Sequence, residues 1–415
     1  MLFPLSTGAP MHPVLDDRLH GSVYTFDETW ESPTRPDGTP HIVWPSMDVS
    51  VISSGGLMAH RSNGFPKPGS LGYFLREREP GAVHFAITNQ CDSRCSTCRF
   101  WRNDDPTHVD LDDAMTAMDV LAGNGVRLVS ITGGEPFCHP QLVDICKGIT
   151  RRGMMVSYLP TNGRAVTEDT VKELVRAGVN IVGVSVDPHG HTTGSRTRDV
   201  DDAMVTRARE TLEDQGVRTY AGILLTDRML PISDCLDRVS EMGFSRAVFS
   251  YPQIDDASPY EASVKHPMLD LDPLYVSAAV DQIKRARRRF HIYNPDETLD
   301  DLVRAYRGEP QAHTCLGGDR ILYLDWDLQV RRCFKEPRSL GSVLDMDHLP
   351  RSNGGCTSCT QQAFRDLSYV LRAYDRFHSI KDRFIPGRVG NVITRGPGWM
   401  GEMRTLFQLL TGGFV

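Results

Sequence analysis

The sequence has no long apolar run and no excess of basic charge. No apolar stretch approaches the ~18 residues that a membrane-spanning helix needs, so we expect no transmembrane segment. The 46 Lys and Arg residues against 53 Asp and Glu residues give a net charge of −7, which disfavours nucleic-acid binding because that function needs a basic face. The N-terminal apolar run is short, interrupted by proline and not preceded by basic residues, so we expect no secretory signal and a cytoplasmic location.

The ten cysteines are the most informative feature of the composition. Without an export signal we expect a reducing compartment, where cysteines indicate metal binding or catalysis rather than disulfides. Three of them form a C-x3-C-x2-C pattern at Cys91, Cys95 and Cys98. Four more lie near the C-terminal end and close with a C-x2-C pair, at Cys315, Cys333, Cys356 and Cys359. We therefore expect two separate thiol sites.

The hydrophobic pattern divides the chain into four regions. Residues 1–80 are rich in Pro, Gly, Ser and His and predict an irregular extension, whereas residues 81–290 alternate apolar strands with amphipathic helices. Residues 310–365 form a small module with short strands near 321–325 and 328–332, and residues 366–415 form a basic, amphipathic tail. The middle region predicts βαβ units and a parallel sheet, which six repeats arrange as a barrel, a partial barrel or a doubly wound sheet.

In such folds the chemistry lies at the carboxyl ends of the strands. We expect strands at 83–88, 127–132, 155–160, 181–186, 219–225 and 247–251, separated by helices near 110–123, 139–152, 167–177, 200–215, 232–242 and 272–289. The first strand ends at the three cysteines and the second at Gly133-Gly134-Glu135-Pro136. Thr161-Asn162-Gly163 and Ser185-Val186-Asp187 end the next two. The sequence therefore predicts one site that all these motifs share.

Three thiolates on one loop can hold three corners of an iron–sulfur cluster and leave the fourth corner open to a cofactor or substrate. The alternative is a zinc site completed by His84 or His108, although zinc sites usually use C-x2-C pairs.

The C-x3-C-x2-C loop after the first strand, together with Gly-Gly-Glu-Pro after the second, resembles the radical S-adenosylmethionine (radical SAM) family over about residues 80–255. The resemblance implies an α/β fold, a partial (β/α)6 TIM-like barrel, with a [4Fe–4S] cluster on Cys91, Cys95 and Cys98. It implies that SAM binds the open iron and is reductively cleaved to a 5′-deoxyadenosyl radical, which abstracts hydrogen from a substrate. A reducing partner such as flavodoxin or ferredoxin supplies the electron in this reading.

The resemblance also implies a set of SAM contacts, namely Gly133, Gly134, Glu135, Asn162, Ser185, Asp187 and Arg196. The glycines allow a close backbone approach, and a carboxylate at Glu135 pairs with the SAM ammonium group. Asn-Gly is also an ordinary turn, and Arg196 is equally well a solvated surface residue. One departure is Thr97, because the family commonly has an aromatic residue before the third cysteine.

The C-terminal cysteines resemble the SPASM and twitch modules, small α+β units that carry auxiliary [4Fe–4S] clusters in this family. Cys315, Cys333, Cys356 and Cys359 suffice for one closed cluster, which favours electron transfer over substrate ligation. Leu328 stands where the module has glycine, and no cysteine follows Cys359, so a two-cluster set is absent. The alternative is a structural zinc site with four thiolate ligands.

For the substrate we favour a small molecule or a lipid. The first 80 residues do not resemble a peptide-binding winged helix. Apolar residues at 399, 403, 406, 407 and 410 share a helical face, which we expect to pack on the domain; the alternative is peripheral membrane contact, which would suit a lipid. The alternatives are a peptide-modifying maturase and a non-catalytic iron–sulfur or zinc redox protein. Cys138, which follows Gly-Gly-Glu-Pro, is a further candidate as a hydrogen-atom donor.

Overall fold

The structure, a computed structural model, describes residues 81–98, 100–102, 104–187, 199–252, 267–350 and 355–383, with side chains up to Arg376 in the last range. The predicted irregular extension and the predicted apolar face at 399–410 lie outside the described residues. Within the part that is described, no helix combines the length and the apolar content needed to cross a bilayer.

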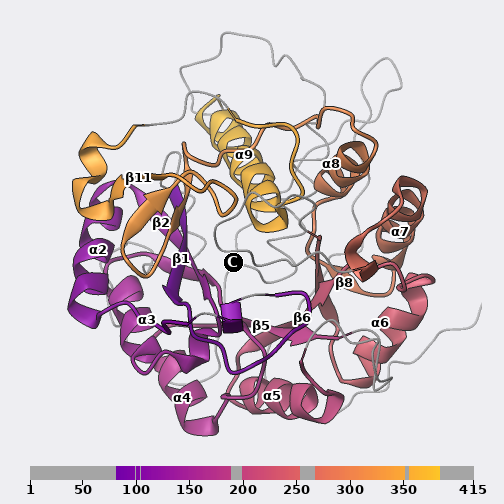
Figure 1. Ribbon diagram of the computed structural model, residues 1–415, viewed down its shortest axis with the longest axis horizontal. Coiled ribbons are helices and arrows are strands. Elements are labelled where there is room, and N and C mark those ends of the chain that lie inside the picture. The colour runs from indigo at the N-terminus through magenta and orange to yellow at the C-terminus, as the bar shows by residue number, and fades with distance from the viewer. Residues whose placement is uncertain are drawn as a thin grey trace, which may run out of the picture. The chain divides into compact units, whose positions relative to one another are not determined.

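Parallel strands and outer helices alternate along the chain, as the hydrophobic pattern predicts (Figure 1). The strands are β1 (Gly81–Thr88), β2 (Val126–Gly133), β3 (Met155–Tyr158), β4 (Pro160–Thr161), β5 (Ile181–Val186), β6 (Arg218–Leu224), β7 (Arg246–Ser250) and β8 (His291–Ile292). The helices between and after them are α2 (Leu111–Gly123), α3 (Leu142–Arg151), α4 (Glu168–Arg176), α5 (Asp202–Asp214), α6 (Ile232–Glu241), α7 (Pro273–Ala286) and α8 (Asp296–Tyr306). The sequence reading missed β8 and α8, because β8 has only two residues and α8 is rich in charge.

The parallel strands divide into two sheets that meet at Leu159. One runs from β1 through β2 to β3, and the other from β4 through β5, β6 and β7 to β8. Leu159, between β3 and β4, still accepts a hydrogen bond from Gly183 N–H at 2.9 Å, so the strands follow one another around an open barrel. The expected partial barrel is confirmed.

Local sequence explains where the helices begin and end. The Asp110 carboxylate accepts hydrogen bonds from the amides of Asp112 and Asp113 and caps α2. Thr167 caps α4, its hydroxyl accepting a bond from Thr170 N–H at 3.3 Å. Gly178 follows α4 with φ +90°, a conformation that glycine adopts without strain.

β1 is buried on both faces, which fits a strand in the middle of a sheet. Its residues Val83, Phe85 and Ile87 belong to the main core with the apolar side of α2. The alternate residues Ala82 and Ala86 instead pack against elements from the C-terminal end of the chain.

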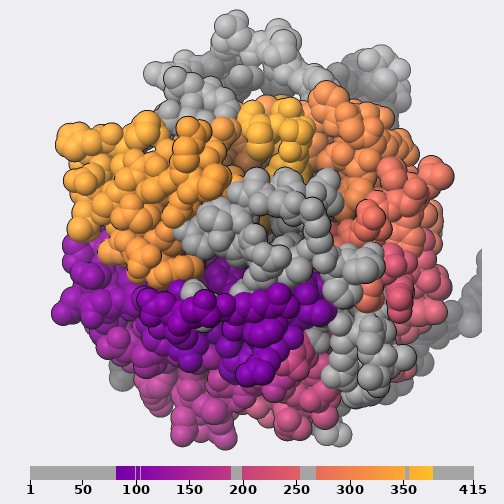
Figure 2. All heavy atoms as spheres, viewed as in Figure 1, coloured from indigo at the N-terminus to yellow at the C-terminus, as the bar shows by residue number. Residues whose placement is uncertain are grey.

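Those C-terminal elements continue the first sheet. Strand β9 (Ile321–Leu324) pairs in parallel with β1, from Ala82 opposite Ile321 to Phe85 opposite Leu324. Strands β10 (Gln329–Arg331) and β11 (Ser339–Ser342) add on antiparallel, and the 3-10 segment η4 (Val343–His348) follows. Figure 2 shows the atoms of this segment, in orange, directly beside those of the N-terminal strand and helix, in indigo. The expected C-terminal strands are present and are joined to the barrel by hydrogen bonds.

Helix α9 (Gln362–Arg383) has no counterpart in the sequence reading, which placed a tail there. Its apolar residues Phe364 and Leu371 pack on Ala82 and Ala86 of β1, and Tyr374 packs on Met155 of β3. These β1 residues point away from the outer helices, so α9 lies against the inner face of the barrel. In Figure 1 it stands between β1 on one side and α8 on the other.

We predict that Leu324→Ala destabilises the whole barrel, because Leu324 is fully buried in the strand that pairs with β1. A buried Leu→Ala change costs about 2–5 kcal/mol, measured by urea unfolding followed by circular dichroism. The matched control is Leu344→Ala, at a residue that is 54% exposed, which we expect to change stability by less than about 0.5 kcal/mol. Separate unfolding of the C-terminal strands before the barrel contradicts the prediction.

Candidate active site

The predicted strand-end motifs line one cavity of about 290 Å³. The predicted site residues on its wall are Cys91, Cys95, Cys98, Gly134, Glu135, Asn162 and Ser185. Thr97, Leu224 and Tyr251 line it as well, together with Phe334 and Gln361 from the C-terminal part of the chain. The strand-end rule therefore locates the cavity correctly, and the C-terminal residues on its wall were not anticipated.

Gly133 and Gly134 pack directly against the backbone of Thr88 and Gln90. A Cβ atom on Gly133, which has φ +122°, would lie 2.1 Å from the carbonyl oxygen of Thr88, and one on Gly134 would lie 2.0 Å from that of Gln90. The N–H groups of Gly134 and Glu135 donate to these same two carbonyls at 2.9 and 2.8 Å. We expected the glycines to admit a ligand, whereas in the structure they admit the backbone that leads into Cys91.

This docking places Glu135 inside the protein beside the cysteine loop. Only 3% of the residue is exposed, and its carboxylate accepts hydrogen bonds from Asn162 N–H at 2.7 Å and Phe137 N–H at 3.1 Å. Burial raises the pKa of Glu135 to about 7, against the opposing effect of these hydrogen bonds. A buried carboxylate on a cavity wall is suited to binding a cationic amino group.

Asn162 uses its side chain to hold the cysteine loop. Its Nδ2 donates to Asp92 Oδ1 at 2.6 Å and to Ser93 Oγ at 2.9 Å. Its backbone N–H is the donor to Glu135 described above. The amide that we expected to contact SAM is therefore already bonded to the loop between Cys91 and Cys95.

Two residues that the sequence reading missed complete this clamp. Asp199 accepts a hydrogen bond from Arg94 N–H at 2.9 Å and its own N–H donates to Cys95 Sγ at 3.3 Å. Arg164 pairs with Asp199 at 2.9 Å and donates to Ser93 Oγ at 3.1 Å. No local motif marks Asp199, because its partners Arg94 and Cys95 lie more than a hundred residues earlier in the chain.

The three thiols share one environment. Burial raises the pKa of the Cys91 thiol, and the proximity of Glu135, Cys98 and Cys95 raises it further. Among the described residues, no three His, Cys, Asp or Glu side chains converge on one point as the ligands of a single ion do. An iron–sulfur cluster does not need such convergence, because each thiolate binds a different iron. The three-thiol set on the cavity wall therefore fits a cluster.

The other predicted site residues are placed differently. Ser185 lines the cavity, whereas Asp187 is buried at the end of β5, where its charge acts on Cys235 of α6. Cys138 lies near Asp92 and Glu135 but is not on the cavity wall. Arg196 lies outside the described residues.

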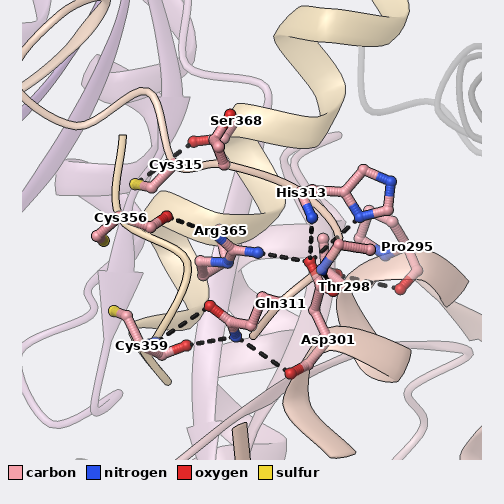
Figure 3. Close-up of polar contacts among 12 residues, drawn as sticks. Pro295, Thr298, Asp301, Gln311, His313, Cys315, Cys356, Cys359, Arg365 and Ser368 are labelled. Atoms are coloured by element: carbon pink, nitrogen blue, oxygen red, sulfur yellow. Dashed lines mark hydrogen bonds and ion pairs between the residues drawn. The ribbon is translucent and has the colours of Figure 1, made fainter. Parts of the chain in front are cut away.

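Three of the C-terminal cysteines, Cys315, Cys356 and Cys359, gather beside α9 (Figure 3). Cys315 N–H donates to the Cys356 carbonyl at 3.0 Å, and a Cβ on Gly355 would lie 2.1 Å from the Cys315 carbonyl oxygen. The Gln311 side chain bonds both backbone groups of Cys359, at 2.7 and 3.1 Å. The loops that carry these cysteines are thus fixed by hydrogen bonds to their backbones.

The sulfur atoms also interact with one another. The Cys315 and Cys359 thiols donate to Cys356, and with the charges of Arg365 and Arg332 they hold the pKa of Cys356 well below its usual value. Further donors reach the other sulfurs, with Gly317 N–H at 3.3 Å from Cys315 Sγ and Gln361 N–H at 3.2 Å from Cys359 Sγ. Clustered sulfurs with surrounding N–H donors fit an iron–sulfur cluster, whose sulfurs accept such bonds.

Residues next to two of the C-terminal cysteines in the chain reach the cavity. Phe334, which follows Cys333, and Gln361, which follows Cys359 by two residues, both lie on the cavity wall. The C-terminal part of the chain therefore contributes to the wall that the first three cysteines also line.

A comparison with protein families agrees with this site. The sequence model of the radical SAM superfamily matches residues 85–229, a range that contains the cysteine loop, Glu135, Asn162 and Ser185. The part of the chain that carries the site therefore matches the radical SAM superfamily.

Known radical SAM proteins resemble this chain over different lengths. The antilisterial bacteriocin subtilosin biosynthesis protein AlbA of Bacillus subtilis (strain 168) is 25% identical over 269 residues, 62% of this chain and 56% of AlbA. A GTP 3′,8-cyclase of Chlorobaculum tepidum is 35% identical over 111 residues, 25% of this chain and 32% of the cyclase. The chain thus matches less than two thirds of either relative.

The fold has a counterpart among solved structures. Streptococcus suis SuiB bound to S-adenosylmethionine superposes with a TM-score of 0.52 at 14% identity, over 65% of each chain. This likeness supports the fold and says nothing of the reaction.

We predict that Gly134→Ala moves the cysteine loop, because the new methyl group would overlap the Gln90 carbonyl. Overpacking of this kind costs about 1–3 kcal/mol, and we expect less iron per chain after anaerobic reconstitution. The matched control is Gly123→Ala at the end of α2, where nothing lies within 4 Å of the added atom. Equal iron content in the two variants contradicts the prediction.

We predict that Glu135→Gln weakens SAM binding about tenfold or more, since a hydrogen bond to a charged group is worth about 1.5–3 kcal/mol. Because the pKa of Glu135 is about 7, the fraction of ionised carboxylate rises between pH 6 and pH 8. SAM affinity of the reconstituted protein, measured by equilibrium dialysis, should therefore rise over this range, and less so in the variant. Identical pH profiles contradict the role assigned to Glu135.

Proposed function

We propose that this radical SAM enzyme abstracts a hydrogen atom from a peptide and carries a second [4Fe–4S] cluster on Cys315, Cys333, Cys356 and Cys359. The observation that supports a peptide is the similarity to AlbA, which extends over 269 residues, 62% of this chain. The similarity to the GTP 3′,8-cyclase of Chlorobaculum tepidum extends over 111 residues, and that to a probable GTP 3′,8-cyclase of Methanococcus vannielii over 229 residues, 54% of this chain. The match to a bacteriocin biosynthesis protein is thus longer than the match to either cyclase. SuiB has also been solved with a precursor peptide, SuiA.

The first cluster would be held by Cys91, Cys95 and Cys98. When the cluster and SAM are bound, they supply the 5′-deoxyadenosyl radical that removes hydrogen from the substrate. The chain's part is to hold the cysteine loop through Asn162, Arg164 and Asp199, and to offer the buried Glu135 carboxylate to the amino group of SAM. Ser185 on the cavity wall is a second proposed SAM contact, and Asp187 and Arg196 remain predictions.

The second cluster would be fully ligated by protein, which suits electron transfer rather than substrate binding. The positions of Phe334 and Gln361 on the cavity wall support such transfer, because these residues are close in sequence to Cys333 and Cys359. Iron analysis distinguishes this proposal from a structural zinc site.

The small-molecule or lipid substrate expected from the sequence has less support. Its basis, the composition of residues 1–80 and the tail at 399–410, lies outside the described residues, whereas AlbA favours the peptide alternative. A reducing partner such as flavodoxin or ferredoxin, and membrane contact through the tail, remain predictions from the sequence.

We predict that the reconstituted enzyme, given SAM and dithionite without oxygen, forms 5′-deoxyadenosine and that Cys98→Ala abolishes its formation. The matched control is Cys235→Ala, because Cys235 is buried on α6 and does not line the cavity. Product is quantified by liquid chromatography. Formation in Cys98→Ala equal to that of the parent contradicts radical SAM chemistry at this site.

The substrate class is tested by deuterium transfer. Extract from the encoding organism, grown in a fully deuterated medium so that every fraction is labelled, is separated into peptide, lipid and small-molecule fractions and supplied to the enzyme. We expect deuterium in 5′-deoxyadenosine from the peptide fraction, and its loss when that fraction is first digested with protease. Transfer from the lipid fraction or from protease-resistant small molecules instead overturns the peptide proposal.

A further inference from the structure

A fully buried ion pair lies behind the C-terminal cysteines. Arg365 of α9 and Asp301 of α8 form it, and their side chains are 3% and 1% exposed. Burial of two charges costs several kcal/mol per ion, and well-packed apolar residues often stabilise a fold equally well. The pair is therefore not explained by fold stability alone, and the residues around it indicate a further role.

Asp301, the negative partner, receives several hydrogen bonds besides the contact with Arg365. Asp301 accepts hydrogen bonds from Ala312 N–H at 2.6 Å and His313 N–H at 3.2 Å, and its partner His313 Nδ1 lies at 3.1 Å (Figure 3). Although burial opposes ionisation, these bonds and Arg365 keep the pKa of Asp301 below its usual value. Asp301 is therefore ionised at neutral pH.

The positive end faces the cysteines. Arg365 Nη1 donates to the Cys356 carbonyl at 3.4 Å, and its charge acts on the Cys356 sulfur. Arg365 Nε is buried and has no hydrogen-bond partner among the described residues. The Arg365 guanidinium is thus the charge nearer to Cys356, whereas the Asp301 carboxylate also contacts His313.

We propose that the Arg365–Asp301 pair sets the reduction potential of the cluster on Cys315, Cys333, Cys356 and Cys359, with Arg365 favouring the reduced state. This inference rests on the second cluster of the proposed function. Reduction adds one electron, and therefore one negative charge, beside a guanidinium that water does not screen. Arg332 and Lys335 are the other cations near these sulfurs, and both are only half-buried, so solvent weakens their effect.

The test uses the full-length chain with Cys91, Cys95 and Cys98 all replaced by Ala, so that only the second cluster is present. Its midpoint potential is measured by anaerobic redox titration followed by electron paramagnetic resonance. Arg365→Met should shift the potential to more negative values and Asp301→Asn to more positive values. Arg365→Lys, which keeps the charge, should lie closer to the parent than Arg365→Met.

The opposite signs separate an electrostatic role from a structural one, because a loosened site that admits water would shift both variants in the same direction. Arg320→Met is the matched control. Arg320 also pairs with an aspartate, Asp375 of α9, but it is not among the charges that act on Cys356. Its potential should equal that of the parent. If Arg365→Met does not fold, the double variant Arg365→Met/Asp301→Asn removes both charges and should show a smaller negative shift.

Shifts of the same sign in the two single variants, or unchanged potentials in all of them, overturn the inference. Iron and sulfide analysis distinguishes this failure from failure of the proposed function. A parent chain that binds zinc or no metal at the four cysteines refutes the second cluster itself, and with it the inference.

Discussion

The site depends on the close approach of two backbones. Gly133 and Gly134 lie against the Thr88–Gln90 segment so closely that no side chain fits between them. This contact joins the end of β2 to the start of the cysteine loop and fixes Glu135 beside Cys91. The clamp from Asn162, Arg164 and Asp199 then holds the same loop from the opposite side. Without the glycines, the cysteines and the carboxylate would not share a cavity.

Much of the fold could be predicted because β1–β7 and α2–α7 carry clear hydrophobic patterns and strong caps such as Thr167. The cavity could also be predicted, since parallel strands bring their carboxyl ends together. The clamp could not, because Asp199 and Arg164 act on the cysteine loop across long sequence separations. The backbone contact of Gly133 and Gly134 was not predicted for a similar reason, since a sequence shows that space is needed but not what fills it. Contact of these glycines with SAM stays a prediction.

Helix α9 is a larger feature that the sequence did not predict. Its Phe364, Leu371 and Tyr374 have helical spacing, yet the many charges between them hide the pattern. The β1 sequence does not predict a helix on the inner face of the barrel either, because Ala82 and Ala86 are small residues of an ordinary apolar strand. Only the assembled structure shows that small side chains on β1 leave room for a helix, and that this helix brings Arg365 to the second set of cysteines.

The pairing of β1 with β9 has a consequence for how the protein is made. Ala82 lies opposite Ile321, so β1 can pair with β9 only after most of the chain has been synthesised. Contacts so distant in sequence form slowly, and until they form β1 presents an unpaired edge that invites aggregation. A ribosome-bound chain can complete its middle repeats early, but the four C-terminal cysteines come together only after the C-terminal strands are made. Metal loading of that second set is therefore expected to follow synthesis rather than accompany it.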